Sequence, residues 1–202
     1  MWAADDDWLD SNYIEECLKV LIEKKEVVLC SGVVKKYKNG TCIGDEYCIA
    51  FNQEKIIDRI YSYYKTPQFN CFYGLYKMKI LKKVNLNDHY VQDWTFLADV
   101  MSYGFIDFVP NVYKHTSMDG NSETREKMNI LYKHNVFKRR FFFYYWLYIL
   151  VCHILFELKN VRLINRLWLA IRVIGLKKTW LFVDIKRLIF GKSFCSKKGY
   201  DK

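Results

Sequence analysis

The residues best suited to chemistry stand near the start of the chain, where Asp5, Asp6 and Asp7 directly precede Trp8. Carboxylate oxygens are the ligands that Mg²⁺ and Mn²⁺ prefer, and these ions bind one or two carboxylates together with the phosphates of a substrate. The same residues could instead only introduce a helix, with Asp7 or Asp10 as its N-terminal cap. The three aspartates alone favour the cap, so the choice depends on the rest of the chain.

A second candidate is Asp93, which stands at the first turn of a helix expected over residues 89–103, before Gly104. An acidic cluster for a metal-bound diphosphate, together with a separate carboxylate, is what glycosyl transfer from a nucleotide sugar requires. The metal stabilises the leaving diphosphate, and the lone carboxylate takes the proton of the acceptor hydroxyl. The alternative for Asp93 is a carboxylate favoured at a helix start by the helix dipole.

Strands and helices alternate around these residues, which indicates an α/β domain. We expect a helix over residues 12–25 capped by Ser11, and a strand over residues 26–34 whose apolar run suits burial on both faces. An aromatic β-like run is expected from Phe69 to Gly74, followed by a basic helix. The other elements expected are a helix over residues 53–65 and a strand over residues 105–113 that Pro110 places at a sheet edge or ends.

Composition narrows the class of protein. Of the 202 residues, 51% are hydrophobic and 18% aromatic, which excludes a disordered chain. The seven cysteines form no C-x-x-C pair and no metal-finger spacing. Because their number is odd and no secretory signal precedes them, we interpret them as reduced thiols of a cytosolic protein.

Charge is unevenly distributed. Residues 132–202 hold 16 Lys or Arg against 3 Asp or Glu, whereas residues 1–131 hold 16 basic against 19 acidic residues. A basic tail favours nucleic acid or an anionic membrane surface as a partner. No nucleic-acid-binding signature accompanies it, so nucleic acid is not an expected partner.

The tail also changes character at residue 141. Residues 141–156 form an apolar run of 16 residues broken by one histidine, shorter than the roughly 20 needed to span a bilayer. Amphipathic basic segments follow near residues 161–175 and 178–190, a composition typical of interfacial helices. Peripheral membrane contact is favoured, and the alternatives for residues 141–158 are packing on the α/β domain and a true span.

Three segments together resemble family 2 glycosyltransferases. They are WAADDDWLDSNYIEECLKVL, FYGLYKMKILKKV and QDWTFLADVMSYGFIDFVPNVYKHTS, and their order and spacing match the family across roughly residues 1–122. The resemblance implies a GT-A fold, a nucleotide-diphospho-sugar donor, Mg²⁺ or Mn²⁺, and inversion at the anomeric carbon.

The resemblance also implies roles for individual residues. Asp6 and Asp7 match the acidic pair of the family's metal motif, with Asp5 or Asp7 holding the cation and the remaining aspartates, Asp5 or Asp6, contacting ribose or sugar. Asp93 matches the family's base, although Gln92 stands where an acidic residue is frequent.

Further substrate contacts are implied for Trp8, Gly74, Lys77 and Trp94. Trp94 would line the acceptor side and Lys77 would lie near the phosphates. Gly74 would let the chain pass close to the sugar, with a simple bulge as the alternative. His115 lies near the family's histidine-bearing segment, but Met118 stands where a histidine is usual, so we expect His115 to be a surface or loop histidine.

A complete member of this family has a nucleotide-binding half before the aspartates. We therefore expect residues 1–122 to be the acceptor half of a GT-A domain truncated at its N-terminus, and residues 123–202 a basic helical extension. The expected function is transfer of a sugar to a saccharide or lipid-linked acceptor in cell-surface polysaccharide synthesis. The expected location is cytoplasmic, peripheral at the inner face of the cell membrane. The alternative is a non-catalytic fragment or membrane-interaction module whose aspartates are helix caps.

Overall fold

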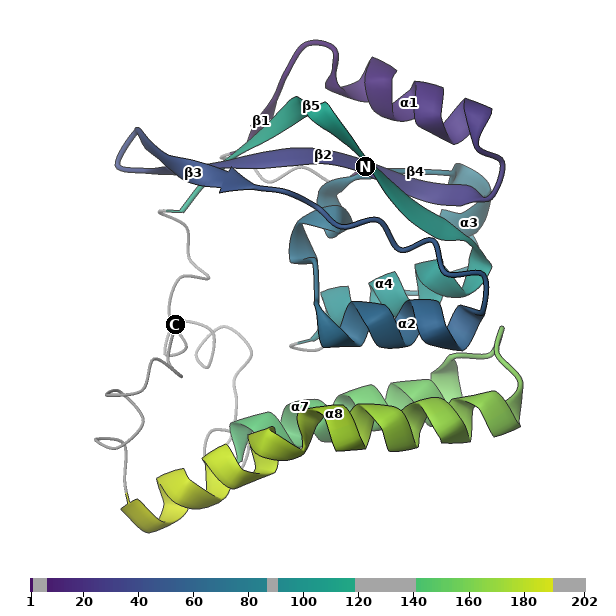
Figure 1. Ribbon diagram of the computed structural model, residues 1–202, viewed down its shortest axis with the longest axis vertical. Coiled ribbons are helices and arrows are strands. Elements are labelled where there is room, and N and C mark those ends of the chain that lie inside the picture. The colour runs from purple at the N-terminus through teal and green to yellow at the C-terminus, as the bar shows by residue number, and fades with distance from the viewer. Residues whose placement is uncertain (2–6, 87–90, 119–140, 191–202) are drawn as a thin grey trace. The chain divides into compact units, whose positions relative to one another are not determined.

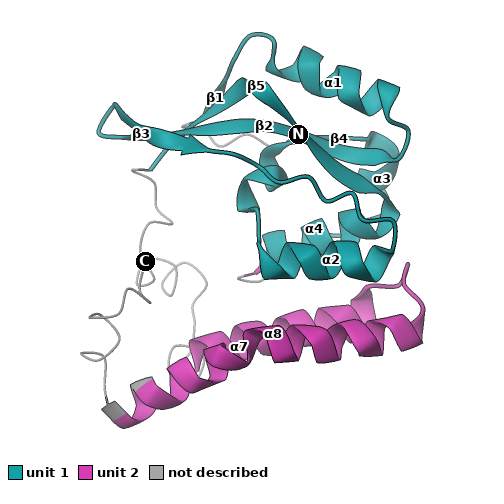
Figure 2. Ribbon diagram, in the orientation of Figure 1, with its two compact units in different colours: residues 1–88, 92–120 teal, residues 89–91, 121–202 magenta. Residues whose placement is uncertain are grey.

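The computed structural model describes residue 1 and residues 7–86, 91–118 and 141–190. The chain divides into two compact units, residues 1–88 with 92–120 and residues 89–91 with 121–202 (Figure 2). Each unit is described by itself below.

The first unit is built on a five-stranded mixed sheet (Figure 1). Its strand order is β1-β5-β2-β3, with β4 also paired to β2; β2 and β5 are parallel, and the other pairs are antiparallel. The strands are β1 (Trp8–Leu9), β2 (Val27–Lys38), β3 (Thr41–Glu46), β4 (Leu75–Tyr76) and β5 (Phe105–Ser117). The unit is therefore a mixed α/β structure, as the alternating elements predicted.

Helices cover both faces of this sheet: α1 lies on one face, and α2 and α4 lie on the other (Figure 1). This explains why β2 is buried along its whole apolar run from Val27 to Val34. The helical elements are α1 (Tyr13–Glu23), α2 (Ile56–Lys65), the 3₁₀ helix η1 (Phe69–Tyr73), α3 (Met78–Leu81) and α4 (Gln92–Tyr103). The aromatic run predicted as β-like is thus a 3₁₀ turn, in which the Gly74 N–H donates to the carbonyl of Cys71.

The core beneath α1 holds a buried tyrosine whose hydroxyl is used by the sheet. Tyr13, Cys17 and Leu21 recur every four residues and pack on β2 and β5. The Tyr13 hydroxyl accepts a hydrogen bond from the Gly32 N–H at 2.9 Å. A Cβ at Gly32 would lie 2.4 Å from the carbonyl oxygen of Val112, so only glycine permits this close approach.

Two further expectations about local structure are wrong. The N-cap of α1 is Asn12 rather than Ser11, and no side chain caps this helix. Asp7 and Asp10 do not cap it either, because their side chains bond to β5 instead.

The second wrong expectation is the edge position of the strand with Pro110. β5 continues to Ser117 and lies between β1 and β2. The pairing of β2 with β5 shifts there, from Gly32–Val109 to Val33–Tyr113. Because Pro110 falls inside this irregularity, its missing N–H interrupts no ladder hydrogen bond.

The second unit contains α7 (Phe142–Cys152), a π-helical turn η2 (His153–Glu157) and α8 (Leu163–Phe190). The Tyr144 N–H near the start of α7 donates to Asp184 Oδ2 near the end of α8 at 2.8 Å, so the two helices are antiparallel. The segments predicted near residues 161–175 and 178–190 form one continuous 28-residue helix. Within the described ranges, neither helix combines the length and apolar character needed to cross a membrane.

Candidate functional site

Asp7 is the one member of the acidic cluster within the described residues; Asp5 and Asp6 lie outside them. Its side chain is 4% exposed, and its Oδ2 accepts a hydrogen bond from Lys114 Nζ at 2.7 Å. Lys114, on β5, is itself only 3% exposed. The antiparallel register of β1 with β5, Trp8 opposite His115 and Leu9 opposite Lys114, brings this pair together.

The second oxygen of the Asp7 carboxylate, Oδ1, is the atom to which a cation could bind. Asp7 Oδ1 is buried and has no hydrogen-bond partner in the described part of the chain. A buried carboxylate oxygen without a donor is unfavourable, and a hard cation would satisfy it. No three His, Cys, Asp or Glu side chains of the described residues lie close enough together to hold a metal. Asp7 therefore offers a single ligand, which suits an ion bound mainly by phosphate and water.

Lys114 also connects Asp7 with the segment before Gly74. Its Nζ lies 4.2 Å from the centroid of the Tyr73 ring, a cation–π contact. Tyr73 is the last residue of η1, and Phe69, the first, packs against Trp94 with ring centroids 5.3 Å apart. One short helical turn thus contacts both the partner of Asp7 and the residue next to Asp93.

Asp93 lies in the first turn of α4, where its Oδ1 accepts the Trp94 N–H at 3.0 Å. Burial raises the pKa of this carboxyl to about 6, against the smaller opposing effect of its backbone hydrogen bonds. α4 ends just before β5 begins. The connection between Asp93 and Lys114 runs through η1. Its Phe69 packs on Trp94, and its Tyr73 lies under Lys114.

His115 is part of the same assembly, and the expectation of a surface or loop histidine is wrong. It belongs to β5 and is 13% exposed. Its Nε2 lies 2.9 Å from Asp10 Oδ1 and its Nδ1 lies 3.1 Å from the Tyr37 hydroxyl. The hydrogen bond from His115 lowers the pKa of Asp10, with a further contribution from the Tyr113 N–H, which donates to Asp10 Oδ2.

Trp8 presents an open aromatic face beside this histidine. Its ring is stacked on His115 with centroids 5.0 Å apart and an interplanar angle of 2°, and it lies 5.1 Å from the Tyr37 ring. The Trp8 residue is 50% exposed. Trp94, in contrast, is 5% exposed and packs among Tyr63, Tyr64 and Phe69, so the structure places it in the core rather than at an open surface.

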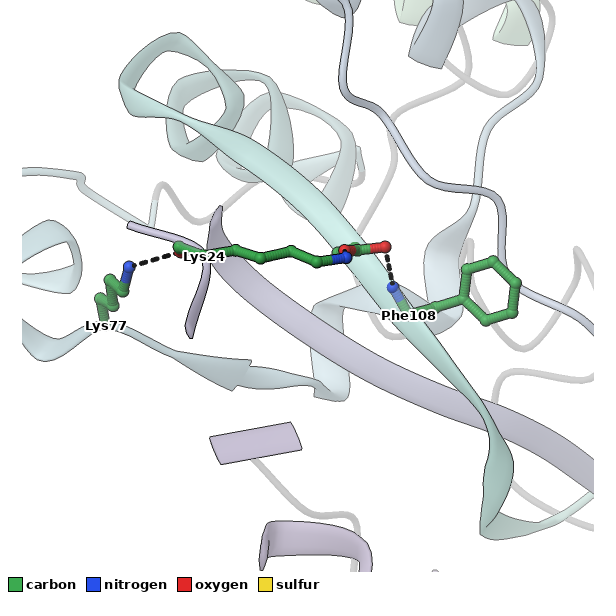
Figure 3. Close-up of polar contacts among 4 residues, drawn as sticks. Lys24, Lys77 and Phe108 are labelled. Atoms are coloured by element: carbon green, nitrogen blue, oxygen red, sulfur yellow. Dashed lines mark hydrogen bonds and ion pairs between the residues drawn. The ribbon is translucent and has the colours of Figure 1, made fainter. Parts of the chain in front are cut away.

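Lys77 lies between β4 and α3, and its side chain points to Lys24 (Figure 3). Its Nζ donates to the carbonyl oxygens of Lys24 at 3.2 Å and Lys25 at 2.9 Å, just after α1. Lys24 in turn pairs with Asp107 Oδ2 at 2.7 Å, and Asp107 Oδ1 accepts the Phe108 N–H. Burial, and secondarily Lys79, lowers the pKa of Lys77.

The register shows how far Lys77 lies from the Asp7–Lys114 pair. The Lys77 N–H bonds to the carbonyl of Val28, whereas Lys114 is opposite Val34. Six residues of strand, about 20 Å, separate the two positions. The structure therefore does not bring Lys77 to Asp7, because its ammonium instead satisfies carbonyls exposed by the end of α1.

Gly74 is explained by packing. A Cβ there would lie 2.6 Å from the carbonyl oxygen of Cys30 and 2.7 Å from Leu29 Cδ1, so β2 fills the space that a side chain would need. Glycine is therefore required at this position because strand β2 packs closely against it.

Sequence reasoning missed Asp10 and Lys114 as functional candidates. Asp7 and Asp10 are acidic, and their partners Lys114 and His115 are basic. This complementary charge is the one signal in the sequence that could have suggested the two contacts.

Comparison with known proteins gives no relative for this arrangement: no family model matches the chain, and no curated protein or solved structure matches it.

Proposed function

We propose that the chain carries part of the active site of a family 2-like glycosyltransferase with a GT-A fold. It would move a sugar from a nucleotide-sugar donor to a saccharide or lipid-linked acceptor in cell-surface polysaccharide synthesis, with inversion and with Mg²⁺ or Mn²⁺. The observation that carries the proposal is Asp93, a buried carboxyl whose pKa is raised to about 6. Strongly perturbed carboxyls of this kind concentrate at functional sites.

Asp93 acts as the general base. At neutral pH most of its carboxyl is ionised, yet it binds a proton more tightly than an exposed aspartate does. It takes the proton of the acceptor hydroxyl as that oxygen attacks the sugar. The hydrogen bond from the Trp94 N–H holds Oδ1 in place, and Oδ2 would take the proton of the acceptor hydroxyl.

Asp7 holds the cation through its unsatisfied Oδ1, with Asp5 as the further carboxylate implied by the family motif. When bound, the cation stabilises charge on the leaving diphosphate. Lys114, already beside Asp7, adds a second positive charge at this place. The half-exposed Trp8 presents an aromatic face against which a sugar ring can pack.

The experiment is a donor screen of the full-length protein with Mn²⁺, followed by Asp93→Asn in the reaction found. We expect the variant to lose transfer while retaining metal-dependent donor binding, measured by calorimetry. The logarithm of the wild-type kcat should rise with pH up to about 6 and then level off. Asp45→Asn, an exposed change on β3, is the control. Unchanged turnover in Asp93→Asn would remove Asp93 as the base.

A non-catalytic module is the second candidate, and one observation favours it. Lys114 already neutralises Asp7, as in a purely structural ion pair. In that case no nucleotide sugar should bind in the presence of Mn²⁺, and Asp7→Asn should change stability alone.

A further inference from the structure

The α8 helix has two apolar faces, and the described residues of its own unit pack against one of them. Leu169, Ala170 and Val173 are at most 4% exposed, and Asp184 on the same side receives the Tyr144 N–H. Among the described elements of this unit, α7 and η2 contact α8. This inner face accounts for the packing of the helical hairpin.

The opposite face is a row of large exposed side chains. Steps of three and four residues place its members on one side of the helix, with Gly175 and Lys178 completing the row. The apolar members are between 48% and 70% exposed, and we call the set the outer stripe: Ile164, Trp168, Ile171, Phe182, Ile185 and Ile189. An exposed helix face with six large apolar side chains marks an interaction surface.

Charge identifies the kind of partner. Residues 141–190 hold eight Lys or Arg against two Asp or Glu, a net formal charge of +6. Lys178 lies within the outer stripe, and Lys186 is exposed at its margin. The apolar side chains of such a row can pack against lipid acyl chains, and its lysines can pair with acidic lipid headgroups.

Other occupants fit less well. A second copy of the chain would bring two helices of the same strong positive charge together, with Lys178 inside the contact. Nucleic acid would satisfy the lysines but would leave six large apolar side chains against a polar surface.

We propose that the outer stripe of α8 lies in the headgroup region of an anionic phospholipid membrane, with the helix parallel to the membrane plane. The protein would then be held peripherally at the anionic, cytoplasmic leaflet. This proposal does not depend on the glycosyltransferase proposal, because vesicle binding needs neither a donor nor a metal.

The test uses the full chain and vesicles of phosphatidylcholine with or without phosphatidylglycerol. We expect the wild type to co-sediment with the anionic vesicles. Ile171→Glu and Phe182→Glu should each weaken this binding at least about tenfold, since each removes one buried side chain from the interface. Ile22→Glu is the matched control, because Ile22 is 68% exposed on α1 in the other unit. Far-ultraviolet circular dichroism checks that α8 remains helical.

Lys178→Gln is a milder second variant. It should weaken binding to anionic vesicles about fivefold and leave binding to neutral vesicles unchanged. The proposal is overturned if the wild type binds no vesicles, or if the stripe variants bind as well as Ile22→Glu does. It is equally overturned if the stripe variants convert a dimer into monomers while no form binds lipid.

Discussion

Lys114 and Asp7, which are 107 positions apart in the sequence, form an ion pair of 2.7 Å whose two side chains are almost completely buried. The pair connects the residue before β1 to β5 and fixes the position of the Asp7 side chain. It also leaves Asp7 Oδ1 unsatisfied among the described residues. The same contact thus stabilises the sheet, and its unsatisfied oxygen is the atom to which we propose that a cation binds.

Lys114→Met is expected to lower the free energy of unfolding by about 3–5 kcal/mol, because it leaves the Asp7 carboxylate buried without its partner charge. Urea denaturation measures the loss. Lys36→Met is the control, since the Lys36–Glu46 pair is about one-third exposed and should contribute about 0–1 kcal/mol. Adding Asp7→Asn to Lys114→Met should recover part of the loss. Equal costs for the two single variants would show that burial of the Asp7 pair is unimportant.

Asp10 should make stability depend on pH on the acid side. Its pKa is lowered in the folded state, first by the hydrogen bond from His115, so its stabilising contribution is fully present above the ordinary value of 3.8. The contribution is lost as the pH falls through the lower folded-state pKa. Thermal melting from pH 2 upward should show a shallower acid decline in Asp10→Asn than in the wild type. Identical declines would contradict a stabilising role for the His115 contact.

Asp93 should make the protein less stable as the pH rises, which is opposite to the effect of Asp10. Its pKa is raised from 3.8 to about 6 by burial, so the unfolded chain loses this proton first, and stability falls as the pH rises from about 4 to about 6. Asp93→Asn removes this cost. The variant should be more stable than the wild type at pH 7, by up to about 3 kcal/mol, and the difference should disappear below pH 4. A constant difference at every pH would instead indicate a packing effect.

Tyr13 and Tyr63 form a matched pair of buried tyrosines for testing one hydrogen bond. The Tyr13 hydroxyl accepts the Gly32 N–H, whereas the Tyr63 hydroxyl has no hydrogen-bond partner among the described residues. Tyr13→Phe leaves a buried N–H unpaired and should cost about 1–3 kcal/mol of unfolding free energy. Tyr63→Phe should be neutral or stabilising. The idea fails if the two changes have the same cost in urea denaturation.

Local sequence patterns were sufficient for the order of elements. Apolar residues every four positions predict α1, and a continuous apolar run predicts that β2 is buried on both faces, because these patterns reflect neighbours along one helix or strand. Gly104 likewise marks the end of α4 at Tyr103. The sequence also singled out Asp93 from its place at a helix start.

What only the tertiary structure decided are the contacts made across the sheet. The pairing of β1 with β5 sets Lys114 against Asp7 and His115 against Asp10 and Trp8, and no local pattern specifies a register between segments a hundred residues apart. The structure also decided that the Lys77 ammonium donates to the carbonyls after α1. It likewise decided that Pro110 lies in an inner strand, at the place where the pairing of β5 with β2 is irregular. The sequence by itself determined which residues could do chemistry, and the folded sheet decided which of them meet.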